Sequence, residues 1–174
     1  MKPIILTAGW ILMLSASFQS PGQSNQLPDV DIFTLGGERI TANSISNDGM
    51  PLILVFFKTF EKKAVDNLTD ITEAYHSQLA DKGVKMIAIC IDCIGKTEHV
   101  KPFVFGRDLD IEVFVDKNGN LKRAMGISNS PYTILYDKEM EVYCRYNGYC
   151  AAAGDLVCEK MKDCLNKMDL TSNP

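Results

Sequence analysis

The sequence predicts an α/β fold in which helices cover both faces of a central mixed β-sheet. Two continuous apolar runs, 51–57 (PLILVFF) and 85–92 (KMIAICID), are typical of strands buried on both faces. Apolar residues at helical spacing separate them, and two alternating segments near the carboxyl end indicate an antiparallel hairpin. Strands that alternate with helices and then close with a hairpin and a last helix favour this architecture.

The elements follow one another along the chain. An N-terminal β-hairpin of 31–35 and 38–41 turns at two glycines, and a helix is expected over 64–79. The remaining elements, each bounded by turn residues, are a polar helix at 97–106, a strand at 113–116, a turn at 117–120, a hairpin of 132–136 with 141–146, and a final helix at 155–168.

Length and composition narrow the class of protein. The 174 residues suit one domain at ~150 residues per domain. Hydrophobic residues at 46% and charged residues at 23% are near the averages for soluble globular proteins, which excludes a disordered chain and a polytopic membrane protein. The net charge of -4 argues against nucleic acid or an anionic membrane as the main partner, because both favour a basic face.

The first residues have the pattern of a secretory signal peptide. Lys2 precedes an apolar run at 4–14, and small residues follow at 15–17. The run is too short for a spanning helix, which needs ~20 residues, so no stable membrane insertion is expected. We predict a signal peptide at 1–24, cleaved between Ser17 and Ser24, and a domain at 25–170. The protein would then be exported to the periplasm, the cell envelope or the exterior.

Four short motifs occur along the rest of the chain. They are LPD at 27–29 with GG at 36–37, FFKTF at 56–60, DKNG at 116–119 and GISNSPYT at 126–133. In this order they resemble motifs of thioredoxin-like proteins of the TlpA/ResA (AhpC/TSA, redoxin) group. The second resembles the segment that leads into their active site, and the last resembles the segment with their cis-proline. The resemblance covers roughly 27–168 and implies a thioredoxin-like fold.

The resemblance breaks at the family's active site. Its chemistry uses a Cys-x-x-Cys at the start of the first long helix, where the helix amides stabilise a thiolate. Those two positions correspond to Glu61 and Ala64 here, and no cysteine precedes Cys90. A carboxylate cannot attack a disulfide, so no catalysis is expected at the usual site. Glu61 is either part of a re-purposed site or, more simply, a solvated acid in the first helical turn.

The family's substrate groove has counterparts in this chain. The residue before the cis-proline pairs its backbone with an extended substrate peptide in the family, and it corresponds to Ser130 before Pro131. Phe60 corresponds to the exposed aromatic residue beside the active site. The resemblance thus implies a groove for a protein or peptide partner, a thiol-containing protein among the candidates. The alternatives are an ordinary proline at the start of a strand and a core phenylalanine.

Cys90 and Cys93 form a Cys-x-x-Cys at the end of the second buried strand. Ligands gather at the carboxyl ends of parallel strands, so these are candidate relocated thiols. Against this, residues three apart in an extended strand lie ~10 Å apart, too far for a disulfide unless the chain turns. Buried free cysteines are also common and unreactive.

Four further cysteines follow, and disulfides are their expected state because exported proteins retain them. Three pairings are possible. The final helix runs back along the preceding strand, which favours a nested pairing; it joins Cys144 with Cys164 and Cys150 with Cys158. Without a second Cys-x-x-Cys, and with both histidines distant in sequence, we expect no metal site, and no cofactor is indicated.

Two functions from different classes stay open. The first is a non-catalytic peptide- or protein-binding module that uses the groove of Phe60, Ser130 and Pro131. The second is an active thiol-disulfide oxidoreductase of cell-envelope redox homeostasis that uses Cys93, with or without Cys90. A structural subunit of an envelope complex is a third option. A reactive thiol of low pKa would distinguish the second from the others.

Overall fold

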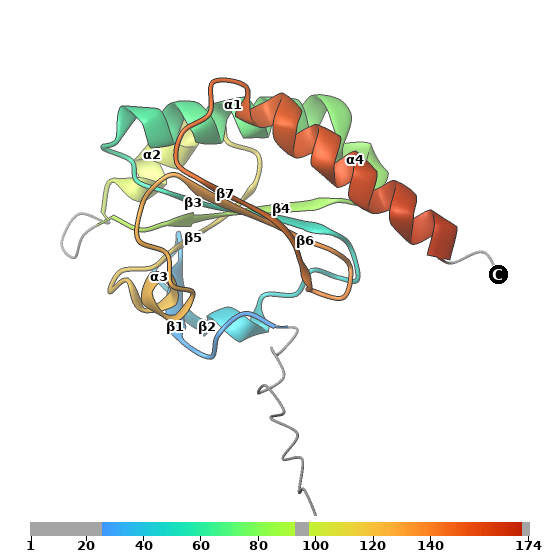
Figure 1. Cartoon of the computed structure of the whole chain (residues 1–174). Helices are drawn as coiled ribbons and strands as arrows, with labels where there is room; N and C mark the ends of the chain where they lie inside the picture. The colour runs from blue at the N-terminus through green and yellow to red at the C-terminus, as the bar shows by residue number, and fades with distance from the viewer. Residues whose placement is uncertain (1–25, 93–97, 172–174) are drawn as a thin grey trace, which may run out of the picture.

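The structure, a computed structural model, describes residues 26–92 and 98–171. The predicted signal peptide at 1–24 lies outside these residues. One sheet contains seven strands in the order β2-β1-β5-β4-β3-β6-β7 (Figure 1). The strands are β1 (Asp31–Thr34), β2 (Arg39–Thr41), β3 (Leu52–Phe57), β4 (Lys85–Cys90), β5 (Glu112–Val115), β6 (Tyr132–Tyr136) and β7 (Val142–Asn147).

Helices lie on both sides of the sheet. In Figure 1, α1, α2 and α4 lie above it and α3 below it. No helix in the described ranges is long and apolar enough to cross a bilayer. The helices are α1 (Lys62–Gln78), α2 (Val100–Gly106), α3 (Asn120–Ala124) and α4 (Ala153–Thr171), with short 3-10 turns η1 (Ala42–Ser44) and η2 (Ala80–Lys82).

The strand pairing confirms the predicted α/β fold with a mixed sheet and an N-terminal β-hairpin. β3 and β4 are parallel, as are β4 and β5, whereas β6 pairs antiparallel with β3 and β7. The hairpin of β1 and β2 joins the sheet through β5. The predicted turn after β5 is present, with the Gly119 N–H bonded to the Asp116 carbonyl at 3.1 Å, but the short helix α3 that follows it was not predicted. There the Asp116 carboxylate accepts the backbone N–H of Lys122 at 2.9 Å.

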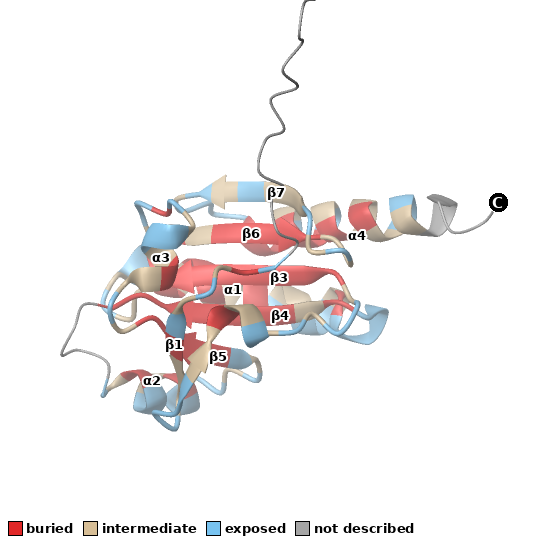
Figure 2. Ribbon diagram, turned by 90° about the horizontal axis from the view of Figure 1, so that it is seen from below, coloured by how far each residue is buried: buried red, intermediate tan, exposed pale blue. Residues whose placement is uncertain are grey.

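The sheet packs against an apolar cluster on each of its two faces. Every residue of β3 is buried, and its side chains alternate between two apolar clusters. Ile53, Val55 and Phe57 pack on the side of α1 and α4, and the intervening residues pack on the opposite side. Figure 2 shows the central strands as buried, whereas the edge strand β7 is partly exposed. The apolar run of β3 is thus explained by helices and loops that cover it on two sides.

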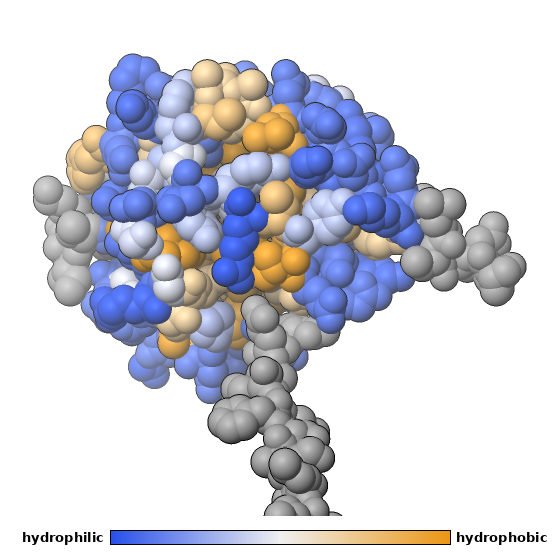
Figure 3. Space-filling view, in the orientation of Figure 1, coloured by the Kyte–Doolittle hydropathy of each residue, from blue (hydrophilic) through white to orange (hydrophobic). Residues whose placement is uncertain are grey.

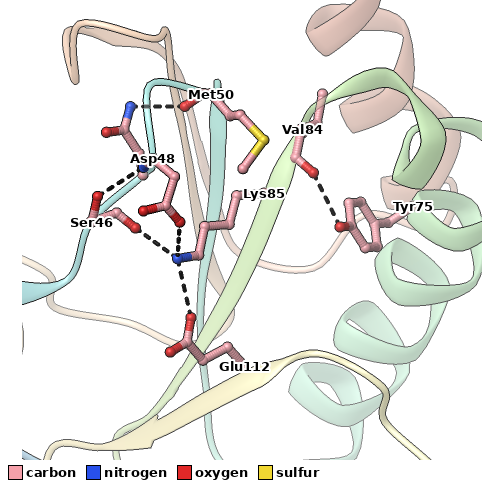
Figure 4. A network of polar contacts seen from close by, with 8 residues as sticks. Ser46, Asp48, Met50, Tyr75, Val84, Lys85 and Glu112 are labelled. Carbon is pink, nitrogen blue, oxygen red and sulfur yellow. Dashed lines mark hydrogen bonds and ion pairs between the residues drawn. The ribbon is translucent and has the colours of Figure 1, made fainter.

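A lysine at the start of β4 joins three segments at the end of the sheet away from α2. Lys85 Nζ lies 3.0 Å from Asp48 Oδ2 and 3.4 Å from Glu112 Oε2, and it donates to the Ser46 carbonyl at 2.7 Å (Figure 4). Hydrogen bonding to Lys85 lowers the pKa of Asp48. These contacts fix the loop before β3 against β4 and β5.

The start of α4 packs closely on α1 through a glycine. The Gly154 N–H donates to Asp70 Oδ2 at 2.9 Å, and a Cβ at this position would lie 2.5 Å from the Asp70 carbonyl oxygen. We therefore expect Gly154→Ala to lower the free energy of unfolding by about 2 kcal/mol, because the backbone of α1 must shift. Urea unfolding measures this.

The matched control is Gly106→Ala. Gly106 also lies at the end of a helix, as the last residue of α2, but no atom lies within 4 Å of a Cβ added there. It should leave stability unchanged or raise it by about 0.5 kcal/mol. Equal midpoints for the two variants would show that α1 and α4 are not closely packed here.

Candidate functional site

A buried carboxylate fastens the segment between β3 and α1 to the end of β4. Asp92 follows β4 and is only 4% exposed. Its Oδ1 accepts the backbone N–H of Thr59 at 3.0 Å, and its Oδ2 lies 2.6 Å from the Thr59 hydroxyl. Because a buried carboxylate is costly unless it is hydrogen-bonded, these contacts fix Thr59.

His99, just before α2, completes this group. Its Nε2 lies 2.6 Å from Thr59 Oγ1 and 3.1 Å from Asp92 Oδ2. A consistent assignment has the Thr59 hydroxyl donating to Asp92 and the His99 Nε2–H donating to Thr59. We call Thr59, Asp92 and His99 the polar cluster. It joins the β3–α1 segment, the end of β4 and the start of α2.

The polar cluster lacks the geometry of a nucleophilic triad. In a Ser-His-Asp triad the two ring nitrogens contact different partners, one the acid and the other the nucleophile. Here a single nitrogen of His99 contacts both Thr59 and Asp92. The cluster therefore holds its three segments together and does not activate the Thr59 hydroxyl.

Phe60 projects from the polar cluster into solvent. Its side chain is 68% exposed, which rules out the core alternative for this residue. Its ring centroid lies 4.2 Å from that of His99, with the two planes tilted by 46°. The imidazole thus supports one face of the exposed ring, and Asp92 in turn holds the imidazole.

The predicted proline lies at the same end of the sheet. The Ser130–Pro131 peptide bond is cis, and Pro131 itself is buried at the start of β6. Its carbonyl accepts the N–H of Gly148 at 2.9 Å, which places the β7–α4 loop beside it. Tyr149 in that loop is 46% exposed and was not anticipated from the sequence. Ser130 Oγ is buried without a hydrogen-bond partner among the described residues.

The two positions of the family's dithiol lie at the start of α1. Glu61 is the N-cap residue, and its backbone carbonyl accepts the N–H groups of Ala64 and Val65 at 2.9 and 3.0 Å. Its carboxylate is half exposed and lies 3.9 Å from Lys58 Nζ. Ala64 is fully buried in the core. These residues make an ordinary helix start with a solvated ion pair.

Of the two candidate relocated thiols, only Cys90 lies in the described residues. Cys90 is fully buried in β4. Burial raises the pKa of its thiol, and the nearby Asp92 carboxylate raises it further. Cys90 is therefore a neutral thiol at neutral pH, unlike a catalytic nucleophile. Cys93 falls in 93–97, outside the described residues.

Alkylation across the chain should separate the cysteines by exposure. In the native protein at pH 8 we expect iodoacetamide to modify the exposed Cys150 well before Cys90, Cys158 and Cys164, which are buried. Burial raises the pKa of each of those three thiols, so each is protonated as well as covered. Mass spectrometric peptide mapping measures the order.

The denatured protein is the control, in which these differences should disappear. Modification of Cys90 as fast as Cys150 in the native state would show that β4 opens readily and would restore Cys90 as a redox candidate.

The predicted nested disulfides are absent from the structure. Cys144, Cys150, Cys158 and Cys164 are all free thiols. One predicted pair joins an exposed loop residue, Cys150, to Cys158, which is buried in the core. In the other pair, Cys164 has its sulfur 4.0 Å from Met168 in the same helix, whereas Cys144 lies on β7 as the cross-strand partner of Leu135. Sequence order placed these cysteines near one another, but their side chains have other neighbours.

No group of three His, Cys, Asp or Glu side chains within residues 26–92 and 98–168 is placed to hold a metal ion.

Known proteins with similar sequences and structures identify the family and the fold of this chain. The sequence profile of the AhpC/TSA family matches residues 24–152, which is most of the chain. The chain belongs to the AhpC/TSA family. The thiol-disulfide oxidoreductase ResA of Bacillus thuringiensis is 29% identical over 118 residues. That alignment covers 67% of this chain and 65% of ResA, just under two thirds of the length of the relative.

Solved structures of thioredoxin-like proteins share the fold. An uncharacterized thioredoxin-like protein from Porphyromonas gingivalis is 30% identical, with a TM-score of 0.70 over 81% of this chain and 92% of that one. A secreted disulfide oxidoreductase of Mycobacterium tuberculosis, described as homologous to E. coli DsbE, is 16% identical, with a TM-score of 0.63 over 78% and 96% of the two chains. This member of the AhpC/TSA family therefore has a thioredoxin-like fold, as the motifs predicted.

Proposed function

We propose that this protein is an exported thioredoxin-like module that binds an extended segment of a partner protein without thiol-disulfide exchange at the family's usual site. The observation that carries the proposal is the exposed ring of Phe60, held by the polar cluster where the family has its active site.

Phe60 has the properties of an interface anchor. Exposed aromatic rings supply a large contact area, and a ring already fixed in place loses little conformational entropy on binding. His99 lies against one face of the ring, and Asp92 fixes His99.

A backbone site for an extended segment would complete the groove. Phe56 pairs with Tyr132, so Pro131 follows as the next residue of that ladder, at the same end of the sheet as Phe60. Ser130 precedes it, and the exposed Tyr149 lies in the adjoining β7–α4 loop. Ser130, Pro131 and Phe60 thus offer a backbone segment and an apolar anchor to the same ligand.

The chemistry at the start of α1 supports a binding role. Glu61 supplies a carboxylate and Ala64 a buried methyl group where exchange needs a thiolate and a resolving thiol. Cys90 is buried and protonated. Among the described cysteines, none occupies the position of the family's nucleophile.

Export is part of the proposal. It rests on the signal-peptide pattern of residues 1–24, and the M. tuberculosis relative is described as secreted. The cell envelope or the exterior would then be the place where this protein meets its partner.

The second candidate is a working oxidoreductase that uses Cys93, with or without Cys90. The match to ResA, which is named a thiol-disulfide oxidoreductase, favours it. In the sequence, Cys93 comes directly after Asp92 of the polar cluster and three residues after Cys90, the last residue of β4. Insulin reduction by the unmodified protein, compared with that by Cys93→Ser, distinguishes this candidate from the binding module.

The binding proposal is tested by removing the anchor. We expect Phe60→Ala to weaken binding of a permanently unfolded, alkylated test protein by about tenfold or more, as loss of an interface hot spot does. Fluorescence anisotropy of the labelled test protein measures the affinity.

Phe105→Ala is the matched control, because Phe105 is 69% exposed on α2 but lies apart from the polar cluster. It should bind as the unmodified protein does. Equal losses in the two variants would indicate nonspecific adhesion to exposed rings, and an unchanged affinity for Phe60→Ala would refute the groove.

A further inference from the structure

A hollow lies on the face of the sheet opposite α1 and α4. Its volume is about 750 Å³, within the range of ligand pockets. The floor is formed by β6 and β7, where Tyr136 and Val142 are cross-strand partners. Leu27, Met125 and Met140 supply apolar walls. Figure 3 shows hydrophobic surface between hydrophilic groups on the face that carries β7.

Two polar groups in this pocket are left for a ligand. Arg145 is exposed and makes no ion pair within the described part of the chain. Tyr136 is 6% exposed, and its hydroxyl has no hydrogen-bond partner there. Burial raises the pKa of Tyr136 to about 12, so the hydroxyl remains a donor at neutral pH. Arg145 is the cross-strand partner of Ile134, and Tyr136 follows Ile134 by two residues in β6, so both side chains line this pocket.

We propose that this pocket binds an amphipathic monocarboxylate, with its carboxylate between Arg145 and Tyr136 and its apolar body against Leu27, Met125 and Met140. A guanidinium suits a carboxylate because its N–H groups match both oxygens, and the phenol adds a third donor. Methionine side chains adapt to ligands of irregular shape.

One neighbouring charge limits the class of ligand. Glu141 also lines the pocket, and its backbone N–H is bonded to Asp137 Oδ1 at 2.8 Å. A second carboxylate on the ligand would meet this negative charge. A single carboxylate on an apolar body therefore fits better than a dicarboxylate or an inorganic anion.

The pocket is separate from the Phe60 groove. It lies at the Tyr136 end of β6, whereas Pro131 precedes the opposite end of that strand. The inference does not rest on the proposed binding of protein segments, and its failure would leave that proposal untouched.

Methionine methyl groups report on the pocket directly. The chain has eight methionines, of which Met125 and Met140 line the pocket, whereas Met86 and Met161 lie in the core cluster on the other face. With methyl-13C-methionine protein, octanoate should shift the signals of Met125 and Met140 saturably and leave those of Met86 and Met161 in place. 1-Octanol, which lacks the charge, should bind at least about fivefold more weakly. A parallel titration with 2-naphthoate distinguishes an aromatic from an alkyl body.

Two variants test the polar contacts. Arg145→Gln should weaken octanoate binding about fivefold, and Tyr136→Phe about threefold. Arg107→Gln is the control, because Arg107 lies over the ring of Phe103 on α2 and not in the pocket. This variant should bind octanoate with the affinity of the unmodified protein. The proposal is overturned by octanol binding as well as octanoate, by an unchanged affinity of Arg145→Gln, or by the absence of a saturable shift at Met125 and Met140.

Discussion

Asp92→Ala should lower the free energy of unfolding by about 3 kcal/mol, the largest loss expected for a single substitution near the candidate site. The Asp92 side chain is 2% exposed and accepts hydrogen bonds from the Thr59 N–H and hydroxyl, with His99 Nε2 at 3.1 Å. Without the carboxylate, these donors are left in a partly buried place without acceptors, and a cavity remains. Urea unfolding followed by circular dichroism measures the loss.

Substitutions at Thr59 separate the hydrogen bonds from the packing. Thr59→Ser keeps the hydroxyl that lies 2.6 Å from Asp92 Oδ2, and it should cost less than 1 kcal/mol, whereas Thr59→Val removes the hydroxyl at constant shape and should cost about 1–2 kcal/mol. Asp92→Asn should fall between Asp92→Ala and the unmodified protein. A loss below about 0.5 kcal/mol for Asp92→Ala would mean that the polar cluster does not hold the β3–α1 segment.

The sheet was predictable because its signals are local and redundant. The run at 51–57 is apolar throughout, and β3 is indeed buried on both faces, between two clusters. The hairpin of β1 and β2 could be predicted from two adjacent glycines, and in the structure one of them, Gly37, has a positive φ of 87°. Helix ends were less predictable: α4 begins at Ala153 and not at residue 155, because its first turn is set by contact of Gly154 with α1.

The polar cluster was not predictable from the motifs. Thr59 and Asp92 are 33 residues apart, and His99 follows only after a further segment, so only the fold brings the three together. The one sequence feature that could have indicated the cluster is Asp92, an acidic residue directly after an apolar strand. The cysteines are a different case: their even number suggested pairs, whereas these thiols are free in the structure, and side-chain direction decides whether sulfur atoms meet.

The largest change in activity is expected from restoring the family's dithiol. The unmodified protein should not reduce insulin disulfides above the background of added reductant, whereas Glu61→Cys with Ala64→Cys should raise the rate about tenfold or more over that background. Position 61 is half exposed at the N-cap of α1, and Lys58 Nζ lies 3.9 Å from the present carboxylate. Both the helix amides and this lysine would lower the pKa of a thiol there.

Single variants show whether both thiols are needed. Glu61→Cys alone should form a mixed disulfide with the substrate but turn over slowly, because the buried position 64 then supplies no resolving thiol. Ala64→Cys alone should stay inactive, since its thiol is covered by the core. An active unmodified protein that loses its activity in Cys93→Ser would establish the relocated oxidoreductase and refute the binding module. An inactive double variant that still folds would show that the groove at Pro131, and not only the pair of cysteines, has diverged from the family.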